Sequence, residues 1–179
     1  MKSRACASVH ISLIATKQNT ICHIWQKGNN SMSKSEKIDW VIHCCANGIT
    51  CAECGEPENG FMPGTCNFHT HGMERYDHPD FQMILAYPIK EIARILNTLG
   101  LRVQAGESFK NGDMVSGIYE DCNVRLSEFE ETGRTVLRVI IPDKYNRFPE
   151  DPDCESPYSL QILATDFIYK KADGRNDKK

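Results

Sequence analysis

Residues 51–72 gather the side chains of this sequence that are best suited to bind a metal. The segment reads CAECGEPENGFMPGTCNFHTHG and holds three cysteines and two histidines. Cys51 and Cys54 belong to a Cys-x-x-Cys-Gly turn, in which the glycine relaxes the backbone so that two thiolates can point at one ion. Cys66 and His69 repeat the two-residue gap after eleven intervening residues. This spacing predicts a Cys3His site, and these soft ligands favour zinc or iron over magnesium or calcium.

The backbone conformation of residues 66–72 decides between two ligand sets. In an extended segment Cys66 and His69 point to opposite faces, whereas His69 and His71 share one face. An extended segment therefore predicts ligation by the two upstream cysteines, His69 and His71. The alternative without a metal is a loop with free thiols and a strand with histidines on one face.

A hydrolase is the alternative to structural zinc. The His-x-His pattern at residues 69–71 imitates the first strand of metal-dependent amidohydrolases, where two imidazoles hold a metal that activates water. That barrel needs about 250 residues, whereas this chain has 179 and no histidine after His78. A small hydrolase with a Cys/His zinc centre and an open fourth position remains the second prediction.

Hydrophobic periodicity predicts two helices. The first lies in SEKIDWVIHCCANG, where apolar residues recur at helical spacing: Ile38, Val41, Ile42 and Cys45. On this helix His43 lies off the apolar face and cannot converge with its neighbour Cys44 on one ligand. The second helix covers residues 88–100, with Pro88 at its start and Gly100 at its end.

Strand patterns occupy most of the remaining domain. Residues 80–87, DFQMILAY, predict a buried strand, residues 123–143 predict a hairpin that turns at Gly133, and residues 159–165, SLQILAT, predict a last strand. This order predicts an α+β fold, a mainly antiparallel sheet with two principal helices packed on one side. Four residues are expected to meet in the core between the second helix and the hairpin: Ile92, Leu96, Val139 and Ile141.

Composition predicts one soluble domain. The chain is 40% hydrophobic and 25% charged with a net charge of -3, so nothing favours a nucleic acid or an anionic membrane as partner. Residues 1–31 hold four basic residues and no acidic one, which predicts a poorly structured leader or an over-extended start. The domain is expected to span 32–169, followed by a polar tail at 170–179. Nine cysteines without a convincing export signal favour a reducing, cytoplasmic setting.

Several motifs resemble the uncharacterised bacterial family called domain of unknown function 4262. They are HTHGM at 69–73, HPD at 78–80 and PDKYNRFP at 142–149, and the resemblance covers about residues 55–163. The histidines on the strand and the upstream cysteines depart from the common pattern of the family. The resemblance implies no known activity and lends no support to a metal site.

The second and third of these motifs supply the candidate ligand-binding residues His78, Asp80, Asp143 and Arg147. If both motifs flank one end of the sheet, their loops would form a pocket, because binding groups gather on loops held by a rigid scaffold. The alternative is a solvated loop in which Arg147 pairs with a nearby acid. Together these patterns predict a binding or interaction module for an unknown small molecule or protein, with possible structural zinc.

Overall fold

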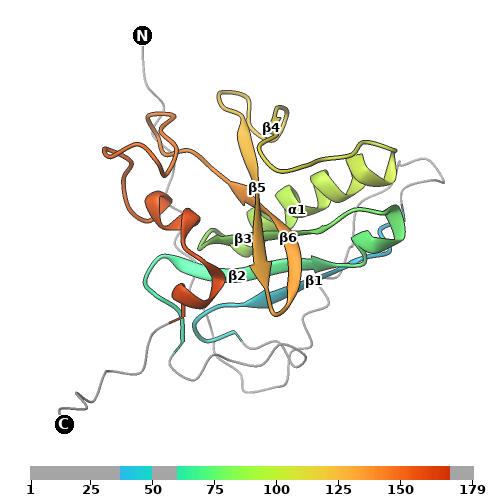
Figure 1. The fold of residues 1–179 in the computed structure, drawn as a ribbon, viewed down its shortest axis with the longest axis horizontal. Coiled ribbons are helices and arrows are strands. Elements are labelled where there is room, and N and C mark those ends of the chain that lie inside the picture. The colour runs from blue at the N-terminus through green and yellow to red at the C-terminus, as the bar shows by residue number, and fades with distance from the viewer. Residues whose placement is uncertain (1–36, 50–59, 170–179) are drawn as a thin grey trace.

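The computed structural model describes residues 37–49 and 60–169, which form a six-stranded mixed sheet with an α-helix packed on it (Figure 1). The strands are β1 Val41–Cys45, β2 Thr65–His71, β3 Asp80–Leu85, β4 Met114–Val115, β5 Val124–Glu131 and β6 Arg134–Ile140. Their order across the sheet is β1-β2-β3-β6-β5-β4. The helix α1 spans Ile89–Gln104, and the 3-10 helices are η1 Met73–Tyr76, η2 Tyr158–Ile162 and η3 Thr165–Phe167.

The sheet is mixed because β3 and β6 run parallel, with Asp80 opposite Val136. The other neighbouring strands pair antiparallel. Parallel strands need a long crossover connection, and here that connection includes α1. The predicted fold class, a mainly antiparallel sheet with two principal helices, is therefore wrong: the described residues form a mixed sheet with one α-helix.

The first predicted helix is instead the edge strand β1. It pairs antiparallel with β2, with Val41 opposite His71. Ile42 and Cys44 pack in the main core beneath α1, whereas Cys45 belongs to a smaller apolar cluster. A strand that is buried on both faces loses the simple alternation of apolar and polar residues, so its apolar positions can also match helical spacing.

The second predicted helix is confirmed, and it begins directly after Pro88. It continues past Gly100 to Gln104, so this glycine does not end the helix. A Cβ atom at Gly100 would lie 2.5 Å from Cζ2 of Trp40. The Trp40 indole is held in place because its Nε1 donates a hydrogen bond to Oδ1 of Asn97 at 3.0 Å. The glycine therefore allows α1 to approach the segment that leads into β1.

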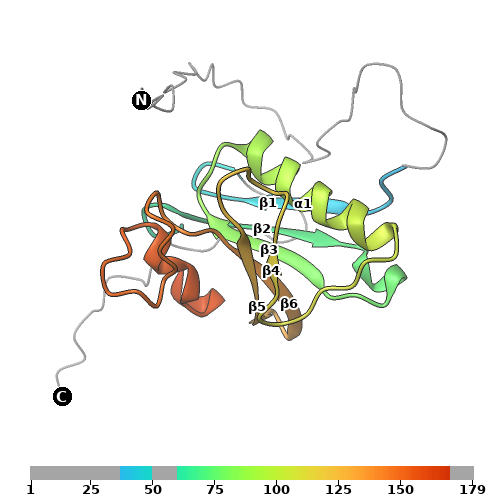
Figure 2. The same cartoon turned by 90° about the horizontal axis from the view of Figure 1, so that it is seen from above.

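The main core lies between α1 and one face of the sheet (Figure 2). The residues expected to meet there are all buried in this one cluster: Ile92, Leu96, Val139 and Ile141. Leu96 is completely buried at 0% exposure. The helical and strand periodicities therefore identified the correct apolar faces of α1 and β6.

The predicted hairpin is confirmed as β5 and β6, but the predicted last strand is wrong. Residues 159–165 lie instead in η2 and at the start of η3. Gln161 is buried, and its side-chain amide bonds both backbone groups of Ile141, accepting from N at 2.9 Å and donating to O at 2.7 Å. The Gln161 side chain therefore satisfies the backbone hydrogen-bonding groups of Ile141, just after β6, in place of a neighbouring strand.

No helix in the described part of the chain is long and apolar enough to cross a membrane. The predicted leader at residues 1–31 and the predicted tail at 170–179 lie outside the described residues.

Candidate metal site

Three histidines from β1 and β2 meet on the sheet face opposite α1. His43 lies directly across from His69 in the antiparallel register, and His71 follows on the same face of β2. The ring centroids are 4.3 Å apart for His43 and His71, 4.9 Å for His69 and His71, and 5.4 Å for His43 and His69. One ring nitrogen from each residue lies within 4.8 Å of the other two, so the cluster could hold a metal ion.

The cluster is mostly withdrawn from solvent. His43 is 8% exposed and His69 is 3% exposed, whereas His71 is half-buried. Buried polar rings are costly unless they have hydrogen-bond partners or bind an ion. Solvent reaches the cluster on the side of His71.

Glu131, at the end of β5, supplies a buried carboxylate to the cluster. Its Oε1 lies 2.9 Å from Nδ1 of His69, and its Oε2 accepts a hydrogen bond from Arg134 at 2.6 Å. Burial alone would raise the pKa of this carboxyl. The hydrogen bonds from His69, Asn67 and Arg134 outweigh burial and lower the pKa to about 2. Glu131 is therefore ionised at neutral pH.

His71 is held neutral at the exposed side of the cluster. Burial and the positive charge of Arg134 lower the pKa of His71 to about 4. One guanidinium nitrogen of Arg134 lies 3.3 Å from Nδ1 of His71 and also contacts the carboxylate of Asp80. A neutral imidazole is the form that binds metals, so His71 needs to lose no proton to act as a ligand at pH 7.

A buried polar network continues from the histidines across β3 to β6. The Gln82 amide donates to Oδ1 of Asn67 at 3.0 Å and to Glu131 at 3.2 Å, and its oxygen accepts from Nε of Arg138 at 2.8 Å. Arg138 is fully buried and also stacks on Phe129, with its guanidinium carbon 3.6 Å from the ring centroid. Each of these polar groups is satisfied, so the network fixes the sheet face on which the histidines lie.

The spacing of ligand nitrogens in a zinc site is a reference for the three imidazoles. Zn–N bonds of about 2.0–2.1 Å place ligand nitrogens about 3.4 Å apart. The nitrogens of this cluster lie within 4.8 Å of one another, which is close enough that the cluster could hold a metal ion. Three protein ligands leave a fourth position for a water molecule or another donor.

Residues 66–71 are extended in β2, as the second ligand set predicted from the sequence requires. His69 and His71 share one face, as an extended segment requires, whereas Cys66 points into the core beneath α1. The Cys66 thiol lies 3.3 Å from the carbonyl oxygen of Leu85, and burial raises its pKa. The structure therefore does not bring Cys66 together with His69. Cys51 and Cys54 lie outside the described residues, so their part in a metal site stays a prediction.

The sequence reasoning missed His43. The helical pattern of residues 38–45 places His43 on a helix surface, which predicts no partner for it on β2. If residues 41–45 are extended, however, His43 alternates with Ile42 and Cys44 and points away from the core. The pairing of one His-bearing strand with the other was the signal that could have identified it.

His78 and Asp80 have structural partners at the start of β3. The His78 Nδ1 lies 2.7 Å from the carbonyl oxygen of Pro79, and its Nε2 accepts from the Phe109 backbone N–H at 3.1 Å. Burial lowers the pKa of His78, in keeping with a neutral ring that uses both nitrogens. Asp80 accepts from the Thr70 hydroxyl at 2.9 Å and pairs with Arg134, which places it at the rim of the histidine cluster.

Asp143 and Arg147 form a local loop pair. The Asp143 carboxylate accepts from two nitrogens of Arg147, at 2.7 and 2.9 Å, and from the backbone N–H of Tyr145 at 2.8 Å. These donors lower the pKa of Asp143 despite its burial. His78 precedes β3, and Asp143 follows β6. Because these two strands run parallel, the two residues lie at opposite ends of the strand pair. The structure therefore does not unite the two motifs in one pocket.

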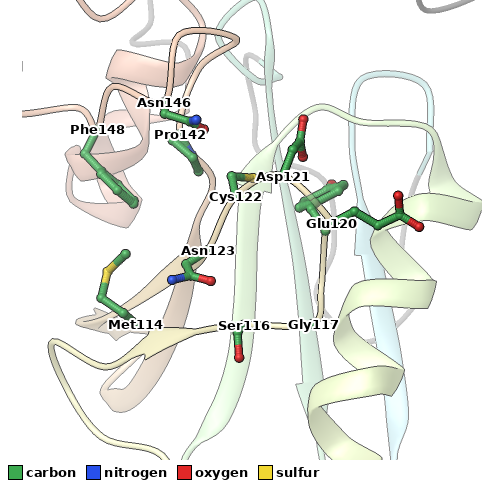
Figure 3. Close-up of a pocket in the computed structure, with 11 residues that line it drawn as sticks. Met114, Ser116, Gly117, Glu120, Asp121, Cys122, Asn123, Pro142, Asn146 and Phe148 are labelled. Atoms are coloured by element: carbon green, nitrogen blue, oxygen red, sulfur yellow. The ribbon is translucent and has the colours of Figure 1, made fainter.

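An open pocket of about 570 Å³ lies beside the loop that leads into β5 (Figure 3). Its walls include Cys122, Asn123, Pro142 and Phe148, but neither Asp143 nor Arg147. Pro142 follows β6 and Asn123 precedes β5, whereas Glu131 lies at the turn of the same hairpin. The pocket and the histidine cluster are therefore at opposite ends of the hairpin.

Comparisons with protein-family models, with curated proteins and with solved structures found no match. The resemblance to domain of unknown function 4262 therefore stays a prediction. The chemistry of the histidine cluster is the basis for a functional proposal.

Proposed function

We propose that this protein is a metal-binding module that holds one divalent transition-metal ion, with zinc as the preferred ion, through His43, His69 and His71. The observation that carries the proposal is the convergence of the three imidazoles, with a ligand atom from each within 4.8 Å of the others.

The donor set supports a transition metal over magnesium or calcium. Imidazole nitrogens suit zinc, copper, iron and nickel, whereas magnesium and calcium prefer oxygen ligands. A neutral His71 and a carboxylate behind His69 also favour binding of a cation. Zinc is the preferred ion because it binds three histidines and one further ligand in a tetrahedral arrangement and undergoes no redox change.

Calorimetric titration of tag-free, metal-depleted protein with zinc tests the proposal. We expect one zinc ion to bind per chain. His43→Ala and His69→Ala each remove a ligand, so each should weaken zinc binding by more than the roughly 10–100-fold caused by loss of an outer hydrogen bond.

Cys66→Ala is the matched control because Cys66 lies on the same strand as His69 but on the other face. It should leave the zinc affinity unchanged. Unaltered zinc binding in both histidine variants, with loss of binding in a Cys51→Ser, Cys54→Ser protein, would assign the metal to the cysteines and refute the histidine site.

A further inference from the structure

Glu131 is the acid at the centre of the polar groups around the histidines. It is only 2% exposed, and its Oε1 lies 2.9 Å from Nδ1 of His69 and 2.7 Å from Nδ2 of Asn67. Its Oε2 accepts from Arg134 at 2.6 Å. Both oxygens are therefore anchored, so the carboxylate presents a fixed acceptor to the His69 ring.

A fixed acceptor determines which nitrogen of a neutral histidine carries the proton. The Glu131 oxygen that faces His69 already accepts from the side-chain amides of Asn67 at 2.7 Å and Gln82 at 3.2 Å, so it acts as an acceptor and the His69 nitrogen that faces it is the N–H donor. The Oδ1 atom of Asn67 also lies near this nitrogen, 3.3 Å from Nδ1 of His69, and an amide oxygen likewise can only accept. Both neighbours thus favour the Nδ1–H tautomer, which puts the metal-binding lone pair on Nε2.

On the basis of the metal site proposed above, we propose that Glu131 is its positioning residue: it locks His69 in the Nδ1–H tautomer, so that Nε2 is the atom that binds the metal. A carboxylate behind a ligand histidine fixes ring orientation and raises the basicity of the ligand nitrogen. Glu131 would act through His69 and would not contact the ion itself.

Arg134 extends this arrangement to the second ligand on β2. It pairs with Glu131 and with Asp80, and the same guanidinium approaches Nδ1 of His71 at 3.3 Å. The hairpin turn that carries both Glu131 and Arg134 lies close to β2 (Figure 1). A change at Glu131 therefore disturbs the support of His69 directly and that of His71 through Arg134.

Nuclear magnetic resonance of the imidazole nitrogens in metal-free protein, followed by zinc titration, tests the role of Glu131. The wild-type protein should show His69 as the Nδ1–H tautomer. Glu131→Gln keeps the shape of the side chain but allows it to donate as well as accept, so the Nε2–H tautomer should appear and zinc affinity should fall about 10–100-fold. Glu130→Gln is the control, because the Glu130 side chain is exposed and accepts from the Thr135 hydroxyl at 3.0 Å.

Two results would overturn the role of Glu131. One is an Nε2–H tautomer of His69 in the wild-type protein, a result that does not depend on the folding of any variant. The other is a Glu131→Gln protein that matches Glu130→Gln in both tautomer and zinc affinity. Failure of the wild-type protein to bind zinc would instead refute the metal site itself, so the two failures can be told apart.

Discussion

Zinc at a hundredfold excess over its dissociation constant is expected to raise the free energy of unfolding by about 2.7 kcal/mol, because it binds the folded chain and not the unfolded one. For a domain of this size the corresponding rise in melting temperature is on the order of 10 °C. The three imidazoles come from two strands, so the complete site exists only when β1 and β2 are paired. Thermal unfolding of tag-free protein with zinc and with a chelator measures the effect.

The same comparison in His43→Ala isolates the contribution of the site. Any cost of the substitution to the metal-free fold appears with and without zinc, so the difference between the two conditions reports metal binding alone. This difference should vanish in His43→Ala and persist in Cys66→Ala. A full zinc-dependent rise in His43→Ala would show that the ion binds elsewhere.

Leu96→Ala is expected to lower the free energy of unfolding by about 2–5 kcal/mol, since it removes a buried side chain and leaves a cavity. Leu96 is 0% exposed and lies in the core cluster that includes Val139 and Ile141. Urea unfolding measures the change. Lys90→Ala, on the exposed start of the same helix, should stay within about ±0.5 kcal/mol of wild type. An equally small change for Leu96→Ala would contradict the packing of α1 on the sheet.

The parts of the fold that could be predicted from the sequence are those with one buried face and one exposed face. The apolar stripe of α1 and the alternation of β5 are of this kind. Elements with unusual surroundings could not be predicted. β1 is covered on both faces, so its residues do not alternate simply between apolar and polar. The segment that forms η2 is as rich in apolar residues as a strand, but the side chain of Gln161 holds it against Ile141.

The candidate site could be predicted in part. Side-chain alternation alone places His69 and His71 on one face once residues 66–72 are extended. The third imidazole depends on the antiparallel register that sets His43 against His69, which no local pattern contains. Glu131 follows His69 by 62 residues in the sequence, and the two meet because the folded sheet brings the end of β5 to β2. Local sequence patterns identify candidate ligands, but the pairing of strands selects among them.

The X-ray absorption spectrum of the zinc-loaded protein tests the central claim most directly, because it distinguishes nitrogen from sulfur ligands without any substitution. Zinc bound by His43, His69 and His71 should show only nitrogen or oxygen neighbours at about 2.0–2.1 Å, with the outer-shell scattering of imidazole rings. Sulfur neighbours at about 2.3 Å would place the ion on cysteine thiolates such as Cys51 and Cys54 and would contradict the three-histidine site.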